Sequence, residues 1–187
     1  MSVAAESDAD SDEALMLAYA AGEQAAFATL YQRYKGSLLR YLLRMVKQPA
    51  VAEDLFQESW NRLVQARQRY VASARFSSWL FQIAHRLALD WIRRDPTHKS
   101  DSIDERVIEF PHGGELPPDE QLVSAEGRAR LFSAIQSLPE DQRAALLLKA
   151  DGELSLEEIA QIQQTGRETV KSRLRYALAK LKEALRT

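Results

Sequence analysis

Residues 155–177 read SLEEIAQIQQTGRETVKSRLRYA, and this pattern predicts two helices joined by a very short turn. Ser155 and Glu158 have the spacing of a capping box, in which a hydroxyl and a carboxylate satisfy the free N–H groups at a helix start. Apolar residues then give the first helix a buried face, at Leu156, Ile159, Ala160 and Ile162. Beyond the turn they recur every three or four residues and form one stripe along the second helix, at Val170, Leu174, Ala177, Leu178, Leu181 and Leu185.

The other side of the second helix is polar and basic. Glu168, Lys171, Ser172 and Arg175 project away from the apolar stripe, and cations dominate residues 166–187. A helix held from behind by apolar side chains, with cations and hydroxyls in front, is how a helix-turn-helix presents its second helix to a DNA groove. The alternative is an ordinary helical hairpin with a solvated basic face. The small Ala160 and the tight turn favour contact with nucleic acid.

The composition is that of a globular protein with segregated charge. The 187 residues are 45% hydrophobic, include no cysteine and carry a formal net charge of −2. The lack of cysteine excludes disulfides and Cys-ligated zinc, and it fits the reducing cytoplasm. No apolar run is long enough to span a bilayer, so we expect no membrane insertion. Because a bulk DNA binder is strongly basic as a whole, the segregated charge predicts one directed DNA contact.

Helical periodicity fills two separate parts of the chain. Residues 27–45 carry apolar side chains at i, i+3, i+4 and i+7, and helical patterns continue to residue 94 and return from residue 125. Between these parts the periodicity is lost, and acids accumulate at Asp95, Asp101, Asp104, Glu105, Glu109, Glu115, Asp119 and Glu120. The sequence therefore predicts an all-α fold of two small helical domains joined by a flexible acidic linker. Its parts are a disordered acidic tail (1–10), a first domain (11–95), the linker (96–124) and a second domain with the helix-turn-helix (125–187).

The sequence predicts neither catalysis nor a bound cofactor or metal. His85, His98 and His112 lie in different segments without metal-ligand spacing, and there is no glycine-rich phosphate loop or nucleophile elbow. Asp54 and Glu58 have the i, i+4 spacing of an acid/base pair or of metal ligands. On a surface helix, however, such a pair is more often simply solvated, so we do not expect an enzyme.

Three stretches resemble the extracytoplasmic-function (ECF) class of bacterial sigma factors. AEDLFQESWNRL (residues 52–63) and RFSSWLFQIAHRLALDWIRR (residues 75–94) are similar to region two of that family. LPEDQRAALLLKADGELSLEEIAQIQQTGRETVKSRLRYALAKLKEAL (residues 138–185) is similar to region four. The resemblance covers nearly the whole chain except the tail and the linker. It implies a subunit that binds core RNA polymerase, recognises two promoter elements and helps to melt the DNA, with an anti-sigma factor as a further candidate partner.

The resemblance also implies roles for individual residues. The helix with Asp54, Gln57 and Glu58 matches the family's polymerase-binding helix. The loop at residues 70–76 matches the family's loop that captures a base flipped from the non-template DNA strand at the minus-ten element, and the helix after it lies beside that strand. The resemblance therefore implies contacts with minus-ten DNA at Tyr70, Ser73, Arg75, Phe76, Gln82, Arg86 and Arg93. The second helix of the helix-turn-helix matches the reader of the minus-thirty-five element, with contacts at Arg167, Glu168, Lys171, Ser172, Arg173 and Arg175. On a helical wheel, we expect Arg175 to read a base and Arg173 to contact a phosphate.

The turn before this helix departs from the family pattern. The family usually has Gly, an aliphatic residue and Ser there, whereas this chain has Gln164, Thr165 and Gly166, and the cap of the second helix is either Thr165 or Gly166. A second capping box from Thr165 and Glu168 is one of these alternatives.

Two other functions compete with that of a sigma factor. A helix-turn-helix transcription factor of the response-regulator type would need a preceding domain with strands, but residues 12–94 show only helical periods. A helical partner-binding regulator without DNA contact would leave the basic last helix unexplained. Finally, the acidic linker predicts two domains that move independently in the free protein.

Overall fold

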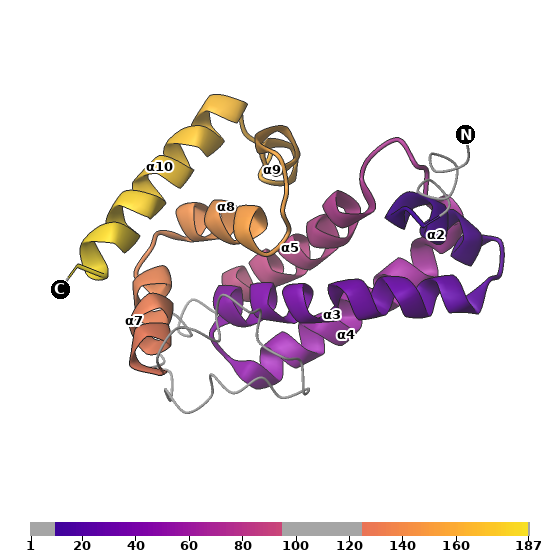
Figure 1. Ribbon diagram of the computed structural model, residues 1–187, viewed down its shortest axis with the longest axis horizontal. Helices are drawn as coiled ribbons and strands as arrows, with labels where there is room; N and C mark the ends of the chain where they lie inside the picture. The colour runs from indigo at the N-terminus through magenta and orange to yellow at the C-terminus, as the bar shows by residue number, and fades with distance from the viewer. Residues whose placement is uncertain (1–9, 95–124, 187) are drawn as a thin grey trace, which may run out of the picture.

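A computed structural model describes residues 10–94 and 125–186, and every regular element in these ranges is a helix (Figure 1). The predicted all-α fold class is therefore confirmed for the described part of the chain. Most of the predicted acidic tail (1–10) and the whole predicted linker (96–124) lie outside the described residues.

The N-terminal half consists of helices α2 (Asp12–Ala20), α3 (Gln24–Val46), α4 (Pro49–Ala66) and α5 (Phe76–Arg94), with a short 3-10 turn, η1 (Arg67–Arg69), after α4. Ser11 caps α2, and Pro49 occupies the first turn of α4, where a missing N–H is tolerated. Helices α2, α4 and α5 all pack against α3. Their apolar stripes meet in a core that includes Leu30, Tyr41, Leu63 and Phe76.

The C-terminal half consists of α7 (Ala125–Gln136), α8 (Glu140–Ala150), α9 (Leu156–Ile162) and α10 (Arg167–Ala184). The predicted capping box is present: the amide of Glu158 donates to the Ser155 hydroxyl, and the Ser155 amide donates to the Glu158 carboxylate. Helices α9 and α10 form the predicted helix-turn-helix. The cap of α10 is Gly166, without a side-chain hydrogen bond, so the second capping box does not form.

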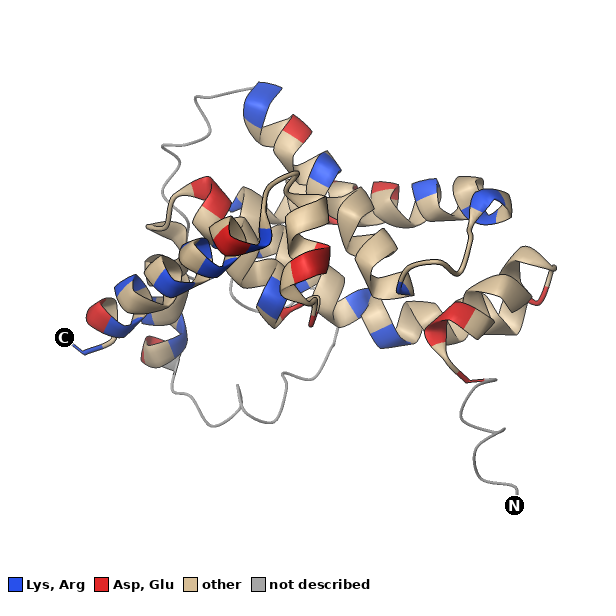
Figure 2. Cartoon of the chain, turned by 90° about the horizontal axis from the view of Figure 1, so that it is seen from above, with Lys and Arg blue, Asp and Glu red and all other residues tan. Residues whose placement is uncertain are grey.

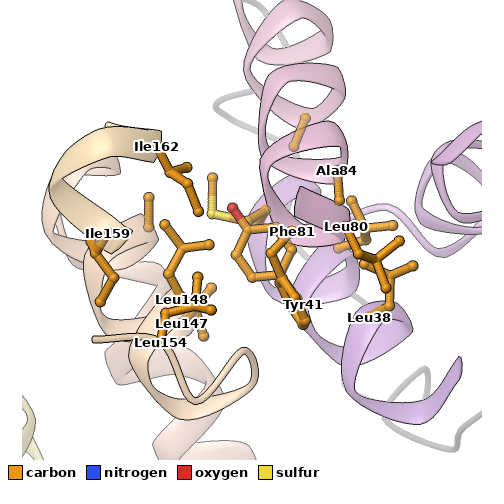
Figure 3. Packing of buried hydrophobic residues seen from close by; sticks show 14 of the residues in the cluster. Leu38, Tyr41, Leu80, Phe81, Ala84, Leu147, Leu148, Leu154, Ile159 and Ile162 are labelled. Atoms are coloured by element: carbon orange, nitrogen blue, oxygen red, sulfur yellow. The ribbon is translucent and has the colours of Figure 1, made fainter. Parts of the chain in front are cut away.

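The two halves pack against each other through one continuous hydrophobic core, in contrast to the independently moving domains that the sequence predicted. Figure 3 shows Tyr41 of α3 and Phe81 of α5 pointing toward Leu147 and Leu148 of α8. The reason lies in α8, where every residue from 143 to 148 is buried. Six consecutive buried residues span more than one full turn, so they need cover on more than one face, and α8 is packed between α10 and α3.

Polar contacts accompany this shared core. The Asp151 carboxylate, just after α8, is 3% exposed and pairs with Arg40 at 3.2 Å and Arg44 at 3.4 Å, both on α3. The Gln136 side chain donates to the Arg44 carbonyl oxygen at 2.8 Å. A charge buried at an interface must be paired to be tolerated, so these contacts fix the register of the two halves.

Candidate functional site

Helix α10 presents an exposed charged face. Its apolar stripe is buried at Val170, Ala177 and Leu181, and Figure 2 shows Lys and Arg residues distributed along its length. Among the side chains predicted to contact DNA, Arg167, Glu168, Lys171 and Arg175 are exposed, and Ser172 is half-buried. The guanidinium of Arg175 lies 5.1 Å from the ring centre of Tyr176. The structure therefore brings these residues together on one accessible surface.

Arg167, at the start of this helix, is tied to its neighbours. It pairs with Glu157 of α9 at 2.5 Å and with Glu168 at 3.2 Å. The hydrogen bond to Glu157 and its charge raise the pKa of Arg167 above its ordinary value. The remaining predicted residue, Arg173, is different. Its side chain is only 21% exposed and pairs with Asp141 of α8 at 2.6 Å, so it does not project freely with the others.

The loop between η1 and α5 is open at its tip. Ser73 is exposed and Val71 is 69% exposed. Tyr70 closes one end of the loop, because its ring packs against Trp79 with 5.0 Å between ring centres. Its hydroxyl is buried without a hydrogen-bond partner among the described residues, and burial raises its pKa to about 12. The loop therefore has a half-buried aromatic side chain at one end and exposed residues at its tip.

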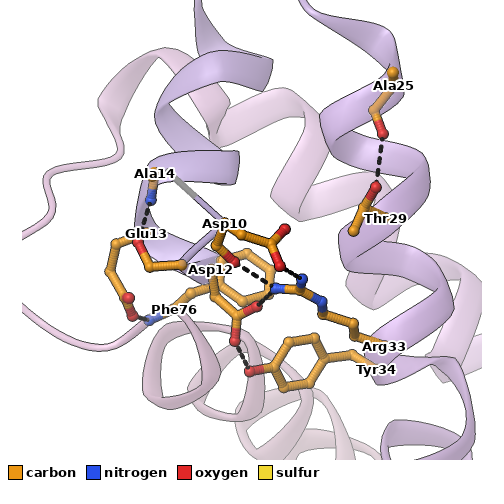
Figure 4. Close-up of polar contacts among 10 residues, drawn as sticks. Asp10, Asp12, Glu13, Ala14, Ala25, Thr29, Arg33, Tyr34 and Phe76 are labelled. Carbon is orange, nitrogen blue, oxygen red and sulfur yellow. Dashed lines mark hydrogen bonds and ion pairs between the residues drawn. The ribbon is translucent and has the colours of Figure 1, made fainter. Parts of the chain in front are cut away.

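Phe76, at the other end of the loop, belongs to the hydrophobic core and not to the surface. Its side chain is fully buried, and its ring lies 5.2 Å from that of Tyr34. Its backbone amide donates to the Glu13 carboxylate at 2.7 Å (Figure 4). Phe76 is the first residue of α5 and not part of the loop, and its buried ring is not accessible in this arrangement, so the DNA contact expected at Phe76 stays a prediction.

A polar network beneath the loop was missed at the sequence level. Arg33 pairs with Asp10 at 2.9 Å and Asp12 at 2.8 Å, and the Tyr34 hydroxyl donates to Asp12 (Figure 4). Burial, together with the hydrogen bond to Asp12, raises the pKa of Tyr34 well above its ordinary value. The sequence pattern indicated no partners for the acids near residue 12, which in the structure anchor α2 to α3.

Arg75 connects this loop to the helix-turn-helix. Its guanidinium lies 3.6 Å from the Glu158 carboxylate of α9 and donates to the carbonyl oxygen of Glu153 at 3.4 Å. The side chain remains 55% exposed. The two regions that the sequence assigned to different promoter elements are therefore in direct contact.

Helix α5 carries a polar stripe that starts beside the loop. Gln82, Arg86 and Arg93 are spaced by four and seven residues, which places them on one face of the helix. Gln82 is half-buried, whereas Arg86 and Arg93 are exposed. The opposite face of α5 contributes Leu80, Ala84 and Ala88 to the core. The stripe is thus held at a fixed angle by the packing behind it.

Helix α4 displays a mixed polar face. Asp54 and Gln57 are exposed, and the Glu58 side chain is 40% exposed. The hydrogen bond from Arg62, at 2.7 Å, lowers the pKa of Glu58, so Glu58 stays ionised. The buried side of the helix packs through Phe56, Trp60 and Leu63. This face lies on a different helix from both the loop and the α10 surface.

In the described part of the chain, no cluster of three or more His, Asp or Glu side chains has the arrangement of a metal site. None of the described helices is both long and apolar enough to cross a membrane.

Comparison with known proteins matches both halves of the chain to one family. The Sigma-70 region 2 family model matches residues 30–96, and the Sigma-70 region 4 model matches residues 128–181. The ECF RNA polymerase sigma-E factor of Escherichia coli is 33% identical over 171 residues, covering 87% of this chain and 88% of that factor. The chain belongs to the ECF RNA polymerase sigma factors. The RNA polymerase sigma-H factor of Pseudomonas aeruginosa is 29% identical over 94% of both chains.

Solved structures share the fold of this sigma factor. CnrH, in complex with the cytosolic domain of CnrY, has a TM-score of 0.68 and 22% identity over 94% of this chain and 97% of that chain. The sigma factor RpoE of Bartonella quintana, in complex with the anti-sigma factor NepR, has a TM-score of 0.66 and 22% identity over 86% of this chain and 97% of that chain.

Family membership decides between the three functions that the sequence left in competition. The protein is an alternative sigma factor, which binds core RNA polymerase and promoter DNA and directs promoter-specific initiation without being an enzyme itself. A response-regulator type of transcription factor is excluded by the region 2 match, which occupies the place where a receiver domain would stand.

Proposed function

We propose that three separate surfaces of this sigma factor each bind a different partner during transcription initiation. The α4 face binds core polymerase, the loop at residues 70–75 with the α5 stripe engages the minus-ten element, and the α10 face reads the minus-thirty-five element. In this assignment, residues 11–95 act as region two and residues 125–187 as region four, joined by the linker at 96–124. The supporting observation is that each surface is exposed and backed by its own apolar stripe.

The α4 face suits a basic partner. Asp54 and Glu58 lie one turn apart with Gln57 beside them, and Asp54 and Gln57 have their side chains in solvent. Opposed charges on two partners raise the rate of encounter and fix their register. Because Arg62 already pairs with Glu58, polymerase binding at Glu58 would exchange one cationic partner for another, and Asp54 carries the larger share of the attraction.

The loop suits an extruded base. Tyr70 supplies a half-buried ring, Ser73 supplies an exposed hydroxyl, and Arg75 supplies a cation at the rim. Taking a base out of the stack costs a few kcal/mol, which contacts in a pocket must offset. Gln82, Arg86 and Arg93 extend this surface along α5 and suit the backbone and bases of the adjoining single strand. Phe76 acts as support for the loop.

The α10 face suits the edges of bases in the major groove. Lys171 and Arg175 are exposed on the same side as Glu168, with Ser172 beside them and Arg167 at the helix start. Arg can bind a guanine with two parallel hydrogen bonds, and Glu can accept from a cytosine amino group. The exposed cations also attract the phosphates on either side of the groove.

A third partner fits the family and the closed arrangement of the two halves. The sigma factors with this fold include proteins solved with an anti-sigma factor bound. We infer that this chain acts in the cytoplasm, with its polymerase, and that an anti-sigma protein controls it. Such a protein acts by stabilising one arrangement of the two halves over another.

Reconstituted transcription tests these assignments. The full-length protein is mixed with core RNA polymerase, and the DNA fragments that the complex retains are sequenced to define both promoter elements. We expect run-off transcripts that depend on both elements, and loss of dependence on the upstream element alone when Lys171 and Arg175 are replaced by alanine. Loss of dependence on the downstream element in that variant would contradict the assignment of α10.

A further inference from the structure

Three helices of the C-terminal half meet in a closed set of hydrogen bonds around Arg173. The Arg173 guanidinium donates to the side-chain oxygen of Gln163 at 3.0 Å and pairs with the Asp141 carboxylate at 2.6 Å. The Gln163 side-chain nitrogen donates to the Asp141 backbone carbonyl at 3.0 Å. Asp141 lies in the first turn of α8, Gln163 caps the end of α9, and Arg173 lies in α10. We call these three residues the cross-tie.

The cross-tie distinguishes Arg173 from the other cations of α10. Its side chain is 21% exposed, whereas that of Lys171 is 65% exposed and that of Arg167 is 52% exposed. A guanidinium that forks onto two acceptors is held in a plane and loses its freedom to reach elsewhere. Its charge is also offset by Asp141 at short range. Both facts make Arg173 a poor phosphate contact.

The turn before α10 leaves the start of this helix without a side-chain cap, so contacts elsewhere must help to fix its position. Gly166 caps the helix without any side-chain hydrogen bond, and Gln164 has a left-handed backbone with φ of 51°. Backbone hydrogen bonds from Gln164 and Thr165 to α9 close the turn, but no side chain caps the first N–H groups of α10. The buried Val170 sets how closely α10 approaches, but an apolar contact alone leaves rotation and tilt weakly specified. The Arg167–Glu157 pair ties the start of α10 to α9, and the directional bonds from Arg173 add a second tie six residues further along, to both α8 and α9.

We propose that the cross-tie of Asp141, Gln163 and Arg173 positions the recognition helix and so sets its base preference, with Arg173 acting through α8 and α9 and not through a DNA phosphate. This inference rests on the proposed reading of the minus-thirty-five element by α10. It replaces the sequence-based expectation that Arg173 contacts a phosphate directly.

The two possible roles of Arg173, phosphate contact and helix positioning, predict different effects of Asp141→Ala on DNA binding. If Arg173 bound a phosphate, removing Asp141 would release the guanidinium and strengthen binding to every DNA. If the cross-tie positions the helix, Asp141→Ala disturbs α10 and lowers the ratio of affinities for matched over mismatched upstream elements. We expect Asp141→Ala and Arg173→Ala each to lower that ratio roughly tenfold, and the double variant to be no worse than either, because residues in one network do not add.

The experiment uses the full-length protein with core polymerase, titrated with salt on promoters that differ only in the upstream element. Loss of a phosphate contact reduces the salt slope by about one unit and weakens all sequences alike. We expect an unchanged slope for Arg173→Ala. Arg173→Lys keeps the charge but loses the fork, so it should behave like Arg173→Ala in base preference. Lys180→Ala, two turns further along α10, is the matched control for loss of one cation.

The same measurements separate failure of this inference from other causes. A partly unfolded variant has a smaller active fraction, which lowers binding to matched and mismatched DNA equally and leaves the ratio unchanged. The inference is overturned if Arg173→Lys matches the wild type in base preference, or if Asp141→Ala binds all DNA more tightly. If the wild type itself shows no preference at the upstream element, the proposed function of α10 fails, and this inference fails with it.

Discussion

Replacing Asp151 by alanine is expected to loosen the contact between the two halves of the protein. The carboxylate is 3% exposed, and its partners Arg40 and Arg44 are 17% and 18% exposed. Removing one member of a buried ion pair costs about 3–5 kcal/mol, because the other member stays buried without compensation. Here the two guanidinium groups can turn partly toward water, so we expect a smaller loss of about 2–3 kcal/mol, at or just below the lower limit of that range.

Urea unfolding can measure this loss because the protein carries a natural reporter. All 3 tryptophans of the chain, Trp60, Trp79 and Trp91, lie in the N-terminal half. Fluorescence therefore follows that half, while circular dichroism follows the helices of both. If the shared core makes one cooperative unit, both signals change together in the wild type. In Asp151→Ala, the dichroism transition should begin at lower urea than the fluorescence transition.

The control for this measurement is the exposed Asp90 of α5. Asp90→Ala removes the same charge from the surface and should change the free energy of unfolding by no more than about 0.5 kcal/mol. The double variant Arg40→Ala with Asp151→Ala should be less damaged than the sum of its parts, because the two residues contact each other. An Asp151→Ala protein as stable as the Asp90→Ala control, with coincident transitions, would show that the buried pair does not hold the halves together.

Three further predictions concern the other surfaces, and a fourth concerns a buried histidine. Reversing the charges of the α4 face with Asp54→Lys and Glu58→Lys should weaken binding to core polymerase while leaving the helix content unchanged, as measured by titration of labelled protein with polymerase. Exchanging residues 70–75 for the loop of a related sigma factor should change the preference at a single downstream promoter position, as read from selected promoter sequences. Arg175→Ala should cost about 1–3 kcal/mol of promoter binding and relax the base preference at the upstream element, as measured on matched and mismatched DNA. Burial lowers the pKa of His85 to about 4, so in acid the unfolded chain binds a proton at this residue more readily than the folded protein does. The free energy of unfolding should therefore fall by about 1.4 kcal/mol per pH unit as the pH drops from about 6.5 toward 4. Urea unfolding at several pH values measures this slope.

Each of these predictions has its own control. For the α4 face, the control is the double variant Glu23→Lys with Glu126→Lys, which changes the net charge by the same amount. Glu126→Lys also removes an i, i+4 ion pair of 2.7 Å within a helix, as Glu58→Lys does. Equal loss of polymerase affinity in both pairs would mean that net charge, and not this face, matters. A loop exchange that altered only the upstream preference would contradict the base-capturing role. Arg175→Ala that weakened all sequences alike would make Arg175 a phosphate contact. A His85→Gln variant with the same pH dependence as the wild type would assign that dependence to other groups.

The local features of the fold were predictable because they depend on neighbours in the sequence. The capping box at Ser155, the proline in the first turn of α4 and the helix-turn-helix all follow from residues within one or two turns of each other. The exposed face of α10 followed from the same periodicity. What the helical wheel did not show is that Arg173, although polar and near that face, has acceptors on two other helices.

The features that were missed depend on residues far apart in the chain. The burial of residues 143–148 on all sides of α8 indicates a second packing partner, but the periodicity of a single helix does not say which one. Phe76 was placed in a surface loop because its partner Tyr34 lies 42 residues away. The contacts of Asp12 were missed because its partners Arg33 and Tyr34 are on the next helix.

The shared core also closes the chain on itself between residues 94 and 125. Loop-closure entropy grows only with the logarithm of length, so doubling the number of residues between these points changes the free energy of closure by about 0.6 kcal/mol. That is smaller than the loss expected from removing the single carboxylate of Asp151. Among related chains, we therefore expect the length between the two halves to vary more readily than the few side chains where α3 and α5 meet α8.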